Sequence, residues 1–217
     1  MATNIRWRGA TLVDIKQVCE IGNFHIANSC CTLETTPLPV SYYEEKLRDL
    51  NARGLPFFVL VTDLDKWIDG SNLILGYCYL SPFGGHLLSY ASTVQLSIYI
   101  CQSYMKTDVG HRFLEEVLIL VAFGKVMHNC VERVGDIARI GAGSALGLVN
   151  QSPLYNIIAI VAVDPKDPDE GNRLKDMLLS LKFVEKGRME KVAMKKGRFL
   201  DTIYLQWTAP ERVRDAR

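Results

Sequence analysis

The stretch Thr93–Phe113, TVQLSIYICQSYMKTDVGHRF, predicts a strand that runs through a short loop into a helix. Its first half is rich in β-branched and aromatic residues, and the apolar residues from Val109 to about Met127 recur at helical spacing. The first N–H groups of a helix have no partner within it, and the helix dipole is positive there. The loop before this helix is therefore a candidate anion-binding site.

The flanking sequence predicts further strands and helices. The expected strands are 5–11, 56–62, 73–80, 92–101, 155–163, 183–188 and 200–207, and the expected helices are 15–28, 41–52, 109–127 and 172–181. Asp14 is the expected cap of the first helix, and Ser41 with Glu44 has the S-x-x-E spacing of a capping box for the second. Together these elements predict a mixed α and β fold.

Length and composition predict one α/β domain. A chain of 217 residues suits a single domain, which we place at residues 1–209, followed by a mobile tail at residues 210–217. Residues 128–152 mix glycines with short apolar groups, and there we expect an insertion with one helical turn or more.

The charge and the cysteines limit the classes of partner. The formal net charge is +1, from 25 basic and 24 acidic residues, so no global field attracts nucleic acid or an anionic membrane. The N-terminus lacks a secretory signal, and no stretch approaches the roughly 18 apolar residues of a membrane span. The six cysteines form no CxxC pair and no cluster with histidines. We therefore expect a soluble cytoplasmic protein with reduced thiols, no metal site, and no nucleic-acid or membrane partner.

Six pieces of the sequence carry a family resemblance. They are IRWRGATLVDIKQV from Ile5, TLETTP at 32–37, GLPFFVLVTD at 54–63, LGYCYLSPF at 75–83, SYASTVQLSIYI at 89–100 and GRFLDTIYLQ at 197–206. In this order they resemble the GNAT superfamily of acyl-CoA N-acyltransferases, and within it the phosphinothricin and methionine-sulfoximine acetyltransferase-like branch. The segment before Tyr155 is similar to the version of this family in filamentous fungi. The resemblance implies a GNAT fold: a central mixed, mostly antiparallel sheet, flanked by helices and splayed between its fourth and fifth strands.

The resemblance also implies a site for acetyl-CoA or another acyl-CoA in the splay. Backbone groups of the strand beside the splay would hold the pantetheine arm, and the loop at 105–110 would hold the pyrophosphate. The implied cofactor-binding residues are Ser97, Ile98, Tyr99, Ile100, Cys101, Lys106, Gly110 and His111. Asp108 stands where the family has a glycine. Its carboxylate either faces the pyrophosphate and weakens binding, or it points outward and caps the helix.

The catalytic residues that the resemblance implies depart from the family pattern at one position. Gln95 stands where this branch has a glutamate that acts as the general base, and a glutamine cannot take a proton. Gln95 could still order a water, bind substrate, or merely be hydrogen-bonded within the sheet. Glu34 could replace the base or bind an amino group, although a solvated loop glutamate is the ordinary case. Tyr99 could orient the substrate or act as an acid, with core packing as the alternative.

Further substrate-binding candidates line the implied cleft. Besides Glu34 they are Phe83, His86, Tyr90, Arg198 and Asp201. A salt-bridged structural role is the alternative for Arg198 and Asp201.

The resemblance implies an acyl-CoA-dependent N-acyltransferase that acts on an amino acid or a small amine, with a homodimer left open. One alternative is a GNAT fold repurposed for isomerisation, elimination or cyclisation of a small metabolite. Another is a binding module without catalysis. The changes at Gln95 and Asp108 keep all three open.

Overall fold

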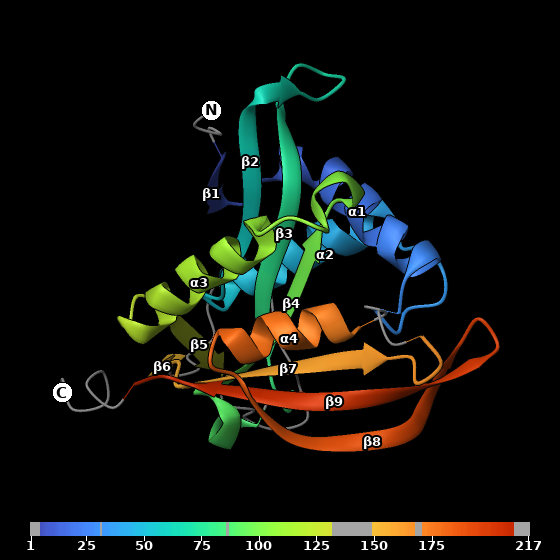
Figure 1. Ribbon diagram of the computed structural model, residues 1–217. Helices are drawn as coiled ribbons and strands as arrows, with labels where there is room; N and C mark the ends of the chain where they lie inside the picture. The colour runs from blue at the N-terminus through green and yellow to red at the C-terminus, as the bar shows by residue number, and fades with distance from the viewer. Residues whose placement is uncertain (1–4, 31, 86, 132–148, 168–170, 211–217) are drawn as a thin grey trace.

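The computed structural model describes residues 5–30, 32–85, 87–131, 149–167 and 171–210 (Figure 1). The sheet contains seven strands in the order β1-β2-β3-β4-β7-β9-β8. Their bounds are β1 Ile5–Gly9, β2 Phe57–Lys66, β3 Asn72–Pro82, β4 Thr93–Ile100, β7 Asn156–Val163, β8 Val184–Lys195 and β9 Arg198–Thr208. Every neighbouring pair is antiparallel except β4 with β7, which is parallel. The predicted mixed, mostly antiparallel sheet is confirmed.

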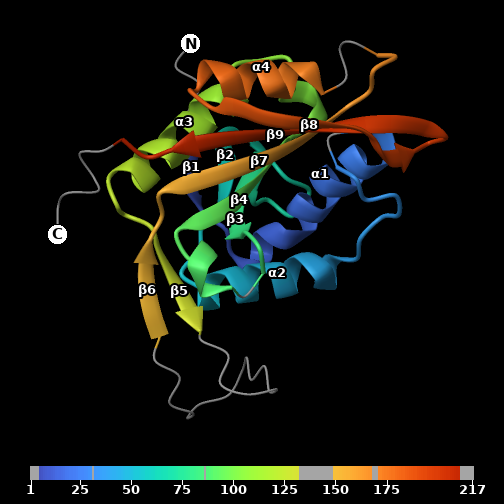
Figure 2. The same ribbon diagram turned by 90° about the horizontal axis from the view of Figure 1, so that it is seen from below.

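Helices cover both faces of the sheet. Helices α1 (Ile15–Asn28) and α2 (Val40–Ala52) lie on one face, while α3 (Val109–Ala122) and α4 (Asn172–Ser180) lie on the other (Figure 2). Each helix packs apolar side chains against the strands, and most of the buried apolar side chains form one large core cluster. Within the described residues, no helix is long and apolar enough to cross a membrane.

The fold differs from the sequence prediction after α3. The predicted helix reached about Met127, but α3 ends at Ala122, because Gly124 turns the chain with a φ of 64° and donates its N–H to the carbonyl of Val121. Residues Met127–Val131 then form β5, which pairs with β6 (Val149–Pro153) in a separate ribbon. The described ends of the segment 128–152 are therefore strands, and the helical turn expected within it falls on its centre, which lies outside the described residues.

The two predicted helix caps make no side-chain bond to their helices, although both helices form and Asp14 does lie at the N-cap position of α1. No side-chain cap bond is present at Asp14 before α1, and α2 begins at Val40 after Pro39, so that Ser41 lies inside the helix. Glu44 pairs with Arg48 instead of reaching back to the start of α2. The carboxylate of Asp14 instead accepts from Arg8 and from Thr11, in a capping box of the 3-10 turn that precedes α1, and that of Glu44 takes an (i, i+4) partner.

Asp14 connects the first strand to the first helix. Arg8 of β1 donates two hydrogen bonds to its carboxylate, at 2.6 and 2.7 Å, and Thr11 donates its N–H and its hydroxyl at 2.8 Å each. Burial alone would raise the pKa of Asp14, but the hydrogen bonds from Arg8 and Thr11 hold that pKa below its ordinary value of 3.8. The bonds thus fix the entry of α1 against the edge of the sheet.

The sheet opens between its fourth and fifth strands. Strands β4 and β7 pair only from Thr93 opposite Asn156 to Leu96 opposite Ala159. Beyond that point β4 stays with β3 as far as Ile100, and β7 stays with β9 as far as Val163. The predicted splay is confirmed, and it leaves half of each strand without a neighbour on the inner side.

Replacing the buried carboxylate should weaken the fold in a pH-dependent way. We expect Asp14→Asn to lower the free energy of unfolding by about 2 kcal/mol at pH 7, because Arg8 loses a bidentate partner. The depressed pKa of Asp14 stabilises the folded state above pH 3.8, and that contribution disappears as the pH falls through the lower folded pKa. Urea unfolding of both proteins at pH 7 and in steps below pH 4 measures the difference, which should shrink with acid. Asp63→Asn, at the exposed pair with Arg6, is the matched control and should cost less; equal losses would contradict the assignment.

Candidate functional site

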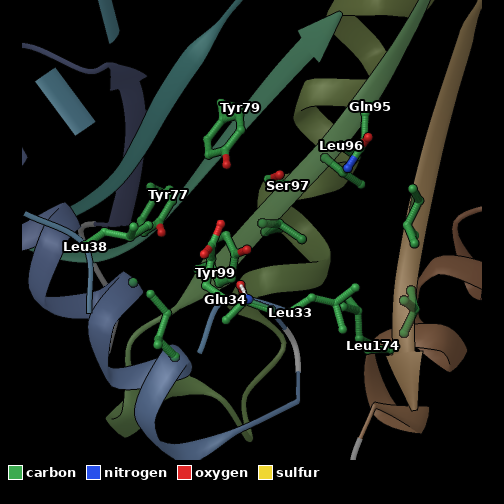
Figure 3. Close-up of a pocket in the computed structure, with 18 of the residues that line it drawn as sticks. Leu33, Glu34, Leu38, Tyr77, Tyr79, Gln95, Leu96, Ser97, Tyr99 and Leu174 are labelled. Carbon is green, nitrogen blue, oxygen red and sulfur yellow. Dashed lines mark hydrogen bonds between the residues drawn. The ribbon is translucent and has the colours of Figure 1, made fainter. Parts of the chain in front are cut away.

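A cavity of about 260 Å³ occupies the splay (Figure 3). Its walls come from both halves of the sheet, from α1, α2 and α4, and from the loop between α1 and α2. The lining residues are Gly22, Ile26, Thr32, Leu33, Glu34, Leu38, Tyr42, Tyr43, Tyr77, Tyr79, Gln95, Leu96, Ser97, Ile98, Tyr99, Ala159, Ile160, Val161, Ala162, Leu174 and Leu178. The separation of β4 from β7 therefore creates a space that reaches helices on both faces.

Three of the predicted residues enter the cavity from alternate positions of β4. Gln95, Ser97 and Tyr99 follow one another along this strand, with Leu174 of α4 across the opening (Figure 3). Alternate residues of a strand share a face, so these side chains point to the same side of the sheet. Tyr77 and Tyr79 of β3 lie opposite Tyr99 and Ser97 and share that side.

A cluster of five tyrosines forms the floor and one wall. The ring centroids of Tyr77 and Tyr99 are 5.0 Å apart, those of Tyr77 and Tyr79 are 6.3 Å apart, and those of Tyr43 and Tyr77 are also 6.3 Å apart. Tyr42 completes the cluster at 5.3 Å from Tyr43. Aromatic pairs of this kind bury large apolar areas and hold the rings in defined orientations, so this side of the cavity is well packed.

Three phenols of this cluster, those of Tyr43, Tyr77 and Tyr79, stay protonated at neutral pH. Burial raises the pKa of Tyr43 to about 12, although a hydrogen bond with Tyr77 acts in the opposite direction. Burial also raises the pKa of Tyr79 to about 12, against the effect of a hydrogen bond with Ser97. The pKa of Tyr77, which is fully buried, lies well above its ordinary value for the same reason. These three groups can orient a ligand, but they are not bases.

Glu34 brings a charge to the cavity from the loop between α1 and α2. The residue is exposed to solvent, and among the described residues that line the cavity it is the only charged one. Its loop is anchored by Lys195 of β8, whose Nζ donates to the carbonyls of Ser29 at 2.9 Å and Thr32 at 2.7 Å. The far half of the sheet thus holds Glu34 at the cavity.

Backbone groups of β4 also face the opening. The N–H of Cys101 donates to the carbonyl of Leu75 on the β3 side at 2.8 Å. Because backbone groups alternate along a strand, those of Ile98 and Ile100 point away from β3. The carbonyl of Ile100 accepts a hydrogen bond from Nε2 of buried His25 at 2.8 Å, and burial lowers the pKa of this histidine. Of the five predicted pantetheine contacts, Ser97, Ile98 and Tyr99 line the cavity, whereas Ile100 and Cys101 lie beyond it.

The loop before α3 leaves its helix N-terminus open. The first bond of α3 runs from the N–H of Arg112 to the carbonyl of Asp108 at 3.1 Å, so the preceding N–H groups have no partner within the helix. The side chain of Asp108 is 63% exposed and pairs with Arg112 at 2.7 Å, without a cap bond to the helix. The side chain of Asp108 therefore points outward, as one of the two alternatives expected, but it does not cap the helix.

Three other predicted residues surround this helix start without lining the cavity. Lys106 is exposed and His111 is half-buried. Gly110 is buried, and a Cβ added to it would lie 3.2 Å from Cγ1 of Ile100. A glycine here therefore allows the helix to approach β4 closely.

The remaining substrate-binding candidates are not brought to the cavity. Arg198 pairs with Asp164 at 2.5 Å, and Asp201 accepts from Arg188 at 2.6 Å and from the N–H of Lys191 at 2.8 Å. These contacts match the alternative of salt-bridged structural roles, with partners that the sequence did not indicate.

Phe83 and Tyr90 pack edge to face against each other, with ring centroids 5.4 Å apart. They too lie outside the set of lining residues. His86 falls outside the described residues. Among the described residues, no three His, Cys, Asp or Glu side chains gather as a metal site would require.

Most of the tyrosine wall, the anchor of the Glu34 loop at Lys195 and the contact of His25 with Ile100 were not predicted from the sequence. Tyr77 and Tyr79 alternate in the strand sequence LGYCYL, a signal that both face one side. No local pattern indicated that Lys195 and His25 reach residues far away in the chain.

The fold is that of known acetyltransferases. No family model matches this chain, and no curated protein is significantly similar to it. A GNAT superfamily phosphinothricin acetyltransferase from Sinorhizobium meliloti, solved with acetyl-CoA, superposes with a TM-score of 0.69 at 21% identity, over 96% of this chain and 90% of that one.

Two further solved structures are similar. An N-acetyltransferase from Staphylococcus aureus has a TM-score of 0.69 at 16% identity, over 95% of this chain and 99% of its own. A ribosomal-protein-alanine N-acetyltransferase from Brucella melitensis has a TM-score of 0.67 at 19% identity, over 94% and 99%. At these identities the likeness shows the GNAT fold.

Gly22 of α1 should be essential for the tyrosine wall. A Cβ at this position would lie 2.0 Å from Oη of Tyr43 and 2.8 Å from Oη of Tyr77. We expect Gly22→Ala to lower the free energy of unfolding by about 1–3 kcal/mol, because two buried rings must shift. Urea unfolding measures the loss, and Tyr43→Phe in the same background should recover part of it by removing the clashing oxygen. An alanine variant as stable as the parent would contradict this packing.

Proposed function

We propose that this protein is an acyl-CoA-dependent N-acyltransferase that acts on a small amine or an amino acid. The observation that supports the proposal is the cavity in the splay, which lies beside backbone groups of β4 that have no strand partner. The superposed Sinorhizobium meliloti enzyme was solved with acetyl-CoA, and this chain has the same fold.

The residues present are compatible with an acyl-CoA. The backbone of Ile98 turns toward the opening, and the open N–H groups at the start of α3 suit a phosphate. The carboxylate of Asp108 is paired with Arg112 and exposed, so it is partly neutralised and screened. When bound, acetyl-CoA would supply the acetyl group as a thioester. The pantetheine arm would lie along Ser97–Ile100, and the pyrophosphate at the loop 105–110.

The chain's own residues would prepare the amine. An amine reaches the site mainly as an ammonium ion and must lose a proton before its nitrogen can attack a carbonyl carbon. Gln95 cannot accept that proton, but its amide can hold a water or the amine in place. Glu34 is the one carboxylate among the described lining residues, so we assign to it the binding of the ammonium and the acceptance of its proton, directly or through water.

The tyrosines would orient the reactants. Tyr99 contributes a phenol to the same face of β4 as Gln95, and we assign to it the orientation of the substrate or the donation of a proton to the leaving group. The closed aromatic wall behind it limits the access of water, which would otherwise compete with the amine.

One observation favours a second candidate function. With Gln95 in place of a glutamate, the strand carries no proton acceptor at the centre of the cavity. A GNAT fold repurposed for other chemistry on a small metabolite, without acyl-CoA, would tolerate this change. Cofactor binding distinguishes the two functions.

Acetyl-CoA should bind to the purified protein. We expect a dissociation constant on the order of micromolar by isothermal titration calorimetry, and an increase in melting temperature with acetyl-CoA. Coenzyme A should compete for the same site, because the arm and the pyrophosphate provide most of the contacts. If neither acetyl-CoA nor longer acyl-CoA molecules produced heat or a thermal shift, the transferase proposal would be excluded.

A carboxylate at position 95 should accelerate the reaction. We expect Gln95→Glu to raise the rate of acetyl transfer by about 10- to 100-fold, since a positioned general base contributes at least that much. The assay follows release of free thiol with a panel of amines. Gln95→Ala is the matched control, because it removes the amide without adding a base, and it should not raise the rate. An unchanged rate in the glutamate variant would show that position 95 is not near the transferred proton.

A further inference from the structure

The described residues that line the cavity carry one charge, and it is negative. Among the described lining residues, Glu34 is the only one that is charged, and no lysine, arginine or histidine lines the space. A carboxylate placed in this cavity would be partly desolvated, without a cation beside it and with Glu34 nearby, and such burial is unfavourable. An ammonium ion has the opposite preference, because Glu34 attracts it.

The tyrosine wall adds to the same preference. Tyr42, Tyr43, Tyr77, Tyr79 and Tyr99 surround one side of the cavity, and the faces of aromatic rings attract organic ammonium ions. The phenols could in principle donate to a carboxylate instead. However, Tyr43 and Tyr77 are hydrogen-bonded to each other, and Tyr79 is hydrogen-bonded to Ser97, so part of the donor capacity of these phenols is used within the protein.

Two lysines contact residues of the cavity lining without lining the cavity themselves. Nζ of Lys46 lies over the rings of Tyr42 and Tyr79, at 5.5 and 5.7 Å from their centroids, and Lys46 does not line the cavity. Lys195 donates to the carbonyls of Ser29 and Thr32. Of these two lysines, Lys195 is held by the loop that carries Glu34. A carboxylate of an acceptor could therefore pair with Lys46 without breaking the hydrogen bonds of that loop, but not with Lys195.

From these observations we infer that the acceptor is a small aromatic or alkyl amine that carries no carboxylate, bound as its ammonium ion between Glu34 and the tyrosine wall. This inference rests on the transferase function proposed above and narrows its substrate class. It excludes free α-amino acids as the preferred acceptors. Transfer forms one amide N–C bond and breaks the thioester C–S bond of acetyl-CoA. The ammonium nitrogen loses two protons: the first goes to Glu34, directly or through water, before the attack, and the second ends on the leaving sulfur, so that coenzyme A departs as its thiol.

Matched pairs of acceptors test the inference. The pairs are tyramine with tyrosine, phenethylamine with phenylalanine, and isoamylamine with leucine, each assayed with acetyl-CoA for kcat/KM. We expect kcat/KM for each amine to exceed that for its amino acid by about 100-fold or more. The reason is the repulsion between Glu34 and the carboxylate of the amino acid in a partly buried site. Tyrosine methyl ester is the control for size, because it keeps the bulk of the carboxylate without its charge, and it should recover most of the activity.

Two variants locate the effect. Glu34→Gln should raise the KM of the amines by about 10-fold, since it removes the charge that holds the ammonium, and it should also lower kcat, since it removes the proton acceptor. In addition, this variant should reduce the ratio of kcat/KM between each amine and its amino acid, because the repulsion between Glu34 and the carboxylate is gone. Lys46→Met should leave the amine kinetics within about twofold of the parent. If Lys46 bound an acceptor carboxylate, this variant would instead raise the KM of the amino acids, and that result would overturn the inference.

The failure of this inference can be distinguished from the failure of the transferase proposal. Calorimetry with acetyl-CoA comes first, and a protein that does not bind any acyl-CoA overturns both. If acetyl-CoA binds and amino acids are acetylated as well as the amines, the transferase proposal stands and the inference is wrong. If acetyl-CoA binds but no acceptor reacts, direct titration of tyramine and tyrosine decides: binding of tyramine alone supports the inference, and any other result overturns it.

Discussion

The short parallel pairing of β4 with β7 is the constraint on which the rest of the structure depends. Four residue pairs, from Thr93 opposite Asn156 to Leu96 opposite Ala159, join the β1–β4 half of the sheet to the β7–β9 half. If β4 and β7 paired along their whole length, the cavity would close. If they did not pair at all, the two halves of the sheet would separate. Beyond the pairs, other contacts bridge the gap: Lys195 to the carbonyls of Ser29 and Thr32, and Cys30 Sγ to the carbonyl of Ala162 at 3.4 Å. The opening is therefore a fixed part of the fold.

Much of the fold could be predicted from sequence because its elements have strong local periodicity. The alternation in β4 and the helical spacing in α3 are properties of neighbouring residues, and the structure confirms both elements. The failures occurred where distant partners decide. Arg8 binds the carboxylate of Asp14, which was expected to cap α1. The ends of residues 128–152, whose composition favours no one structure, become strands because β5 pairs with β6. Local pattern gives no information about either competitor.

The candidate site was predictable to the extent that it lies on one strand. Gln95, Ser97 and Tyr99 share a face of β4 by simple alternation, so the structure brings them together. Arg198 and Asp201 were grouped with them by resemblance, but each has its own partner, Asp164 and Arg188. The aromatic wall requires residues from α2 and β3 to converge, and only the packed fold shows that.

The anchor of the Glu34 loop has a consequence for the order in which the protein matures. Lys195 is 163 positions away in sequence from Thr32, whose carbonyl it binds. During synthesis the first half of the sheet emerges from the ribosome well before β8, and domains tend to fold as they emerge. The loop that carries Glu34 cannot make its hydrogen bonds with Lys195 until the last hairpin, β8 and β9, has formed. A nascent or truncated chain that ends before this lysine also lacks β9, the strand that joins β7 to β8, so it has neither the second half of the sheet nor a finished site. Substrate recognition is therefore completed only with the final residues of the sheet.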